Sequence, residues 1–583
     1  MQPSTNASLE AESNTDISSK KLEAGIATPQ TVDITNDAKI AESEGSNPVP
    51  LLSDARLYII GLGIWISLFL AAFEITVVAT SLVKITSEFQ DFNRANWIVV
   101  VYLLTYTGFL LLSSKLCNIL GIKAMFLAAN LIFGVFSVAC GASKSMTQLI
   151  IFRAFQGIGG GGIYCISFIL MFSIITKDKL GTFSGGISSV FAVASICGPL
   201  LGGVITEKAS WRWIFYLNGP GVLVAFVILY FAIPDIGSAK MNRQTLSRID
   251  FGGGFFSVAW SILVVYALQE GGVEYPWGHS VILGTLISGI VGLFIFAGYE
   301  WYIAKKSDII EPIFPLRLLK SPAFTYIVLT TFCIGVPIYV TIITIPQRYQ
   351  IVNGVSPIRS GVLLLPMLVV SPVMSLIPGL ALKSYYKYVP YGLVVGGALS
   401  VAGSAGLGVL GYSDKIQAKT YGFLVLLGAG MGLVMPVGVI LVKVICDSKD
   451  EAVGLGAQNM TRVLGGLVGL AIGTAILHQK VETELPGVLS EAQLRSLLKS
   501  PQILATLEPE QLLAVRKVYA SSYDLQFNMA TGFAALGFIF ACITTYYVLE
   551  LVKDVKAEDL FNNLGMKKVE EQQPEGEKKA EQV

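Results

Sequence analysis

Long apolar stretches, separated by short polar segments, dominate the chain from about residue 57 to residue 552. A helix needs roughly 20 apolar residues to cross about 30 Å of hydrocarbon, and fourteen stretches are long enough. They lie at about 57–83, 95–114, 124–143, 147–176, 180–206, 211–233, 250–268, 280–303, 322–345, 360–382, 389–411, 418–445, 452–477 and 525–552. The pattern therefore predicts an all-α membrane protein with fourteen transmembrane helices.

Three polar segments are longer than the connections between spans. Residues 1–54 are rich in Ser, Thr and Asn, and residues 553–583 alternate Lys and Glu, so both are expected to be solvated tails. The third, about 478–524, predicts one or two amphipathic helices that begin after Ser490 and at Glu508–Pro509. Lys and Arg are more numerous in the loops on the side of the tails, which predicts cytoplasmic termini and an extracellular 478–524 segment.

An internal repeat relates the fourth and fifth spans to the twelfth and thirteenth. A shift of 271 residues superimposes six glycines without a gap: Gly157/Gly428, Gly159/Gly430, Gly161/Gly432, Gly185/Gly456, Gly198/Gly469 and Gly202/Gly473. The repeat predicts two six-helix halves, at 55–233 and 305–552, with two inserted helices in 234–304. Parallel halves of this kind are the architecture of a secondary transporter.

Composition excludes other classes of protein. Of the 583 residues, 53% are hydrophobic and 14% are charged, which is too little charge for the surface of a soluble multidomain enzyme. A net charge of +1 is unlike the positive field of a nucleic-acid binder. The seven cysteines and two histidines lack the spacing of a disulfide framework or a metal site. We therefore expect no enzymatic activity, no cofactor, no metal and no nucleic-acid partner.

Three ionisable side chains lie well inside the predicted spans: Glu74, Arg153 and Arg462. Charge inside hydrocarbon is costly and usually functional. Because burial favours the neutral form of a carboxyl group, Glu74 can take up and release a proton near neutral pH. We predict a proton site there, with a second role as the counter-charge for a cationic substrate. The alternative is an ion pair or hydrogen bond that holds two helices together.

The two arginines stay protonated and need acceptors inside the bundle. Arg153 either resets the proton affinity of a carboxylate as the helices move or has an architectural role. Its counterpart in the repeat is Leu424, and the counterpart of Arg462 is Phe191, so each arginine serves one half only. For Arg462 a coupling role and a structural role are equally open.

Three motifs in consecutive spans resemble signatures of the major facilitator superfamily. Span 4 contains RAFQGIGGG, span 5 contains SICGPLLGG, and span 6 begins with WRWIFYLNGP. The matching residues are Arg153, Gln156, Gly157 and Gly160 in the span-4 motif, Gly198, Pro199, Gly202 and Gly203 in the antiporter motif, and Trp211–Pro220 at the start of span 6. The last of these resembles the fourteen-span drug:proton antiporter branch. The proline predicts an interruption of span 5 by a kink.

Two positions depart from the family pattern. Glu74 replaces the aspartate of the branch's Leu-Asp-x-Thr-Ile-Val motif in span 1, where the family implies proton coupling and substrate contact. The loop between spans 2 and 3 keeps Lys115, Gly121 and Lys123 of the family's cytoplasmic gating motif. It has Asn118 in place of the family's acidic residue. The resemblance therefore implies that the charge interactions that hold the outward-facing state in the family are weaker here or replaced.

The resemblance implies proton-coupled efflux of a small amphipathic organic compound by alternating access. The acidic Ser/Thr-rich tail and the long segment before the last span resemble fungal members, which export toxins, other secondary metabolites or drugs. Small organic substrates, protons and the lipid bilayer are the expected partners, for a monomer in the plasma membrane rather than the vacuolar membrane. The alternatives are proton-coupled uptake, for example of an iron chelate or a nutrient, and a transport-dead membrane sensor.

Overall fold

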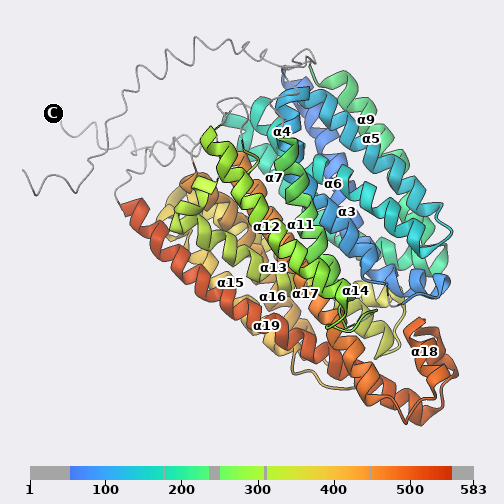
Figure 1. The fold of residues 1–583 in the computed structure, drawn as a ribbon. Helices are drawn as coiled ribbons and strands as arrows, with labels where there is room; N and C mark the ends of the chain where they lie inside the picture. The colour runs from blue at the N-terminus through green and yellow to red at the C-terminus, as the bar shows by residue number, and fades with distance from the viewer. Residues whose placement is uncertain are drawn as a thin grey trace, which may run out of the picture. The chain divides into compact units, whose positions relative to one another are not determined.

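The computed structural model describes residues 53–553, except 93, 175–176, 235–249, 273, 307–311, 315, 447–449 and 500. Nearly all of the two predicted tails, and most of the segment that joins the first half to the inserted helices, lie outside the described residues. Every regular element in the described part is a helix, which confirms the predicted all-α class (Figure 1).

The helices follow the predicted spans in order. Their bounds are α3 Asp54–Phe89, α4 Trp97–Leu120, α5 Ile122–Gly141, α6 Met146–Ile174, α7 Lys177–Lys208, α8 Arg212–Tyr216, α9 Asn218–Ala232, α11 Phe251–Glu270, α12 Ser280–Lys306, α13 Pro322–Ile351, α14 Pro357–Tyr385, α15 Tyr391–Leu407, α16 Lys419–Ile445, α17 Glu451–Glu484, α18 Glu491–Lys499 and α19 Pro509–Lys553. Three short 3-10 helices, Leu316–Lys320, Tyr386–Tyr388 and Pro501–Thr506, join them.

Twelve helical segments in the described ranges are long and apolar enough to cross a membrane. Two shorter apolar segments, Trp97–Leu110 in α4 and Tyr391–Leu407 in α15, lie at the second and eleventh predicted spans. A multi-pass helical membrane protein is thus established, and the count of fourteen spans stays a prediction.

Six helices before α11 pack on one another in the same pattern as six helices after α12. We call α3 to α7 with α9 the N-terminal set, and α13 to α17 with α19 the C-terminal set. In the first set α3 packs on α7 and α9, and α6 packs on α4 and α5; in the second α13 packs on α17 and α19, and α16 packs on α14 and α15. The helices α6 and α16, and likewise α7 and α17, therefore occupy equivalent places, in the order that the sequence repeat predicts.

Glycines of the repeat make these packings close. In α6, Gly157 and Gly161 lie against carbonyl groups of α4, and in α16, Gly428 and Gly432 lie against carbonyl groups of α14. A side chain at any of these four positions would collide with the main chain of the neighbouring helix. Small residues allow membrane helices to approach closely, so close helix packing explains why glycine recurs at these positions in both halves of the repeat.

The segment at about 478–524 is more helical than expected. α17 continues to Glu484, and α18 begins after Ser490, whose hydroxyl and the Gln493 side chain cap each other's backbone amides. α19 begins at Pro509, as predicted, but does not stop before the last span: it is one helix of 45 residues (Figure 1).

The two additional helices, α11 and α12, pack on each other, and α11 contacts α4 of the N-terminal set and α17 of the C-terminal set. Asp250 caps the start of α11, because its carboxylate accepts a 2.7 Å hydrogen bond from the amide of Gly253. The two sets also meet directly, through α7 with α14 and through α4 with α17.

Candidate functional site

Glu74 of α3 and Arg153 of α6, which the sequence places in different spans, form an ion pair. The Arg153 Nη1 atom lies 2.5 Å from Glu74 Oε1, and their side chains are at most 1% exposed. A buried charge without a partner is strongly destabilising, so this pair joins α3 to α6.

The Arg153 guanidinium is held on several sides. Its Nε donates to the carbonyl of Ile98 at 2.9 Å, and Nη1 donates to Gln156 Oε1 at 2.8 Å. The centre of the guanidinium lies 4.3 Å from the centre of the Tyr102 ring, within cation–π range. This arginine is therefore fixed by α4 and by its own helix as well as by Glu74.

The second oxygen of Glu74 is also bonded. Asn218 Nδ2 in α9 donates to Glu74 Oε2 at 2.6 Å, and Gln156 Nε2 donates to Ser137 Oγ in α5 at 2.6 Å. Five helices of the N-terminal set thus supply one buried polar network. Asn218, Ser137 and Tyr102 are functional candidates that the structure adds to those predicted from the sequence. The sequence signal that could have identified them is an amide or hydroxyl side chain inside an otherwise apolar span.

Arg462 of α17 lies outside this network. Its Nη2 donates to Asn459 Oδ1 at 2.5 Å, and its Nη1 donates to the hydroxyl of Tyr339 at 3.2 Å. Within the described residues no carboxylate pairs with Arg462, so its contacts are with neutral groups. The structure therefore separates Arg462 from the Glu74–Arg153 pair.

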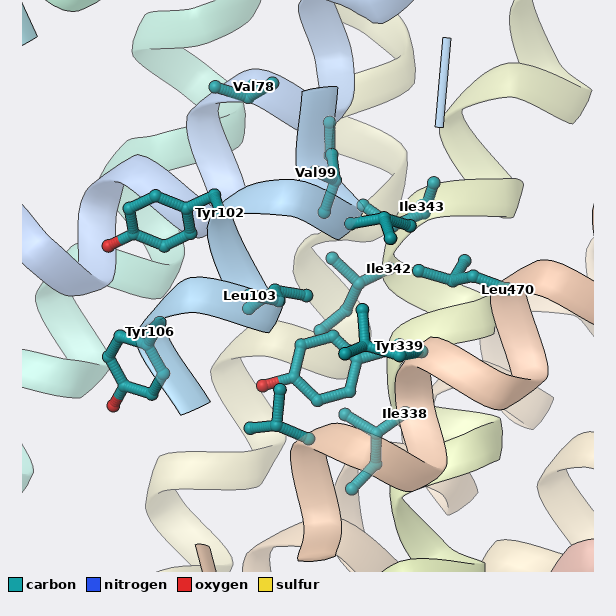
Figure 2. Packing of buried hydrophobic residues seen from close by; sticks show 14 of the residues in the cluster. Val78, Val99, Tyr102, Leu103, Tyr106, Ile338, Tyr339, Ile342, Ile343 and Leu470 are labelled. Atoms are coloured by element: carbon teal, nitrogen blue, oxygen red, sulfur yellow. The ribbon is translucent and has the colours of Figure 1, made fainter. Parts of the chain in front are cut away.

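Tyrosines surround Arg462 from both sets. Tyr106 of α4 and Tyr164 of α6 pack edge to face with ring centres 6.0 Å apart, and both lie near Arg462. Figure 2 shows Tyr102 and Tyr106 on one face of α4, with the Tyr339 hydroxyl directed toward this helix. Arg462 thus lies where α17 and α13 face α4 and α6.

The antiporter-motif residues give α7 two packing faces. Gly198 and Gly202 lie against α3, at Thr76, Val77 and Thr80, whereas Pro199 and Gly203 lie against α14. α7 runs without a break from Lys177 to Lys208 with Pro199 inside it, so the helix does not end at the proline, and the predicted kink stays a prediction. The loss of one amide donor does not end a helix whose neighbours fix its course.

Two glycines of the span-4 motif hold α6 close to α4. A Cβ atom on Gly160 would lie 2.5 Å from the Tyr102 hydroxyl oxygen, and one on Gly157 would collide with Thr105 and the Tyr102 carbonyl. These glycines let Tyr102 reach its place against the Arg153 guanidinium.

The predicted gating residues lie at the junction of α4 and α5. Lys115 and Asn118 belong to the last turns of α4, and their side chains lie outside the described part. Gly121 ends α4 with φ 88°, a conformation that favours glycine. The Lys123 ammonium lies 5.4 Å from the ring centre of Tyr230 in α9. Charge gating at this junction stays a prediction.

Two matching sets of membrane helices around buried, paired charges define an integral membrane transporter rather than an enzyme. The model of the Major Facilitator Superfamily matches residues 64–470, and the chain belongs to this family.

Fungal transporters are among its relatives. The chain is 38% identical to the MFS-type transporter FPY5 of Fusarium mangiferae over 488 residues, and this match covers 82% of each protein. It is 30% identical over 551 residues to the MFS-type efflux pump LUC4 of Fusarium sp, covering 92% of this chain and 94% of that protein. The MFS-type efflux pump MFS1 of Arthroderma benhamiae is 28% identical over 514 residues, covering 87% of this chain and 94% of that protein.

Solved structures share the fold. A bacterial homologue of the human lysosomal transporter Spinster, in an inward-facing and unoccupied conformation, has a TM-score of 0.57 at 14% identity, covering 86% of this chain and 98% of that chain. The POT family transporter PepTSo has a TM-score of 0.56 at 13% identity, covering 85% of this chain and 99% of that chain.

Proposed function

We propose that this transporter exports a small amphipathic organic compound, such as a toxin, another secondary metabolite or a drug, in exchange for protons. It works by alternating access, as a monomer in the plasma membrane. The supporting observation is the Glu74–Arg153 ion pair. Among the ion pairs of the described residues, it is the one in which both side chains are at most 1% exposed.

Proton uptake at Glu74 would change the contacts of three helices. The ionised carboxylate accepts from Arg153 of α6 and from Asn218 of α9. A neutral carboxyl loses the charge that attracts Arg153, and the arginine keeps its bonds to Gln156 and the Ile98 carbonyl and its contact with the Tyr102 ring. Protonation therefore weakens the links of α3 to α6 and α9, which couples proton binding to movement within the N-terminal set.

Export rather than uptake is supported by the relatives that are named efflux pumps, LUC4 and MFS1. The short apolar segments of α4 and α15 complete the proposed fourteen spans. The proposed halves are residues 55–233 and 305–552, and the substrate would bind between them near the middle of the membrane.

Transport in sealed membrane vesicles tests the proton coupling. Substrates are first selected by growth protection, using yeast cells that lack their own drug exporters and carry or lack this chain. Vesicles from the protected cells are then given an imposed pH gradient, and substrate flux is compared with and without the gradient. We expect the gradient to drive flux in the natural protein and to have no effect on flux in Glu74→Gln.

Glu88→Gln is the matched control, because the same change is made in the same helix. Glu88 is 44% exposed and pairs with Arg212 near the end of α3. Its variant should keep gradient-driven flux. Full coupled transport by Glu74→Gln, or flux in the natural protein that ignores the gradient, would overturn the proposal.

A further inference from the structure

The charges at the centre of the bundle do not sum to zero. Arg153 neutralises Glu74, and both are out of contact with water. Arg462, by contrast, has only neutral hydrogen-bond partners in the described part of the chain, Tyr339 and Asn459. The described interior between the two sets therefore carries one positive charge that lacks a paired anion.

The same place also lacks a hydrogen-bond acceptor. Asn459 is 7% exposed, and its Nδ2 has no hydrogen-bond partner among the residues that the structure describes, although its Oδ1 accepts from Arg462. Within the described residues the Arg462 side chain makes two hydrogen bonds, and a guanidinium has five donors. The buried, unpaired Nδ2 of Asn459 is costly, and the partly exposed Arg462 beside it has donors left for an added acceptor.

Aromatic rings lie beside these donors. Tyr164 contacts Tyr106, and its ring centre lies 5.0 Å from that of Phe168 and 6.1 Å from that of Phe191. Unlike Arg153, both Arg462 and Tyr164 are only partly buried, so they are accessible from the space around them. An anionic head and a flat apolar body would match this combination of donors and rings.

We infer that Arg462, with Asn459 beside it, binds the acid group of the substrate, and that the substrate is an aromatic amphiphile carrying a carboxylate or a similar anion. This inference rests on the proposed function, since it names the substrate class of the same transporter. Arg462 and Asn459 come from the C-terminal set, and Tyr106 and Tyr164 come from the N-terminal set. A bound acid would therefore link the two sets.

A cationic substrate fits less well. The carboxylate that would pair with it is Glu74, and both of its oxygens are already bonded, to Arg153 and Asn218. A cation near Arg462 would also meet a like charge in a medium that screens it poorly.

Binding of matched pyrene probes tests this inference on the purified full-length protein in detergent. The probes are 1-pyrenebutyrate, 1-pyrenebutanol and 4-(1-pyrenyl)butyltrimethylammonium, which share one ring system and differ in charge. Energy transfer from tryptophan to pyrene reports binding. We expect the acid to bind about tenfold or more tightly than the alcohol, and the ammonium to bind least.

Two variants separate recognition of the acid from a structural role. Arg462→Gln should weaken acid binding about tenfold or more and leave alcohol binding unchanged, whereas Arg462→Lys should keep the preference for the acid. Arg359→Gln removes a positive charge from an exposed position and should change neither. Thermal unfolding checks that each variant is folded.

The inference is overturned if the acid does not bind, if the alcohol or the ammonium binds as tightly, or if Arg462→Gln leaves acid binding intact. The binding test needs no pH gradient, so its result is independent of the Glu74→Gln flux test. Acid binding without gradient-driven flux would refute the proposed coupling alone, and gradient-driven flux without a preference for the acid would refute this inference alone.

Discussion

A buried carboxylate and a buried guanidinium stabilise the protein only while each keeps its partner. At the scale of single residues, this makes the Glu74–Arg153 pair sensitive to the loss of either member. Arg153→Leu should lower the free energy of unfolding by about 3–5 kcal/mol, because Glu74 loses its buried partner and must then either carry an unpaired charge or take up a proton in a site without water. The measurement is denaturation with sodium dodecyl sulfate in mixed micelles.

The double variant Glu74→Gln with Arg153→Leu provides the control. It removes both charges, so it should recover a large part of the stability that Arg153→Leu loses. Equal losses in the single and the double variant would mean that the packing of Arg153 against Tyr102, rather than its pairing, stabilises the fold.

Individual charged residues could be found from the sequence, but their partners could not. Glu74, Arg153 and Arg462 are rare charges in apolar spans, and scarcity alone identifies them. Which of them meet depends on the rotation of each helix about its axis and on its neighbours. The sequence therefore grouped Arg462 with the proton-coupling residues, whereas the structure places it beside Asn459 and Tyr339.

At the scale of helices, α14 provides a pair of glycines that test packing. Gly361 lies against the Pro199 carbonyl of α7, whereas a Cβ atom on Gly379 would meet no atom of the described residues within 4 Å. Gly379→Ala should stabilise by up to about 1 kcal/mol, because alanine favours the helix. Gly361→Ala should destabilise despite this gain, because the new methyl group must push α14 away from α7.

Melting temperatures in the same detergent compare the two alanine variants with the natural protein. Opposite shifts are expected. If Gly361→Ala also raised the melting temperature, the close approach of α7 and α14 would not be needed for stability.

Helix type was predictable from apolar length, but helix ends were not. The start of α19 at Pro509 follows from a sequence signal, whereas its continuation through 525 does not. A hydropathy pattern locates the part of a helix that crosses a membrane, and a helix with an amphipathic extension continues beyond it. The same limit explains α7, because a proline inside a well-packed membrane helix need not end it.

At the scale of the whole transporter, the two sets are bonded to each other at one end. Asn96 Nδ2 before α4 donates to Thr474 Oγ1 of α17 at 2.6 Å, and Gln350 Nε2 of α13 donates to the Thr80 carbonyl of α3 at 3.2 Å. If the termini are cytoplasmic, as the distribution of Lys and Arg predicts, this is the extracellular end. Alternating access then requires these contacts to break when substrate leaves.

A cross-link between α4 and α17 tests this requirement. Asn96→Cys and Thr474→Cys are combined in a chain whose seven native cysteines are replaced by alanine. A short bifunctional thiol reagent should then stop substrate flux, and reduction should restore it, because the two sets are held together only while the link persists. The same reagent on either single-cysteine chain should leave flux unchanged. Continued flux through a fully cross-linked protein would mean that substrate leaves without separation of the sets at this end.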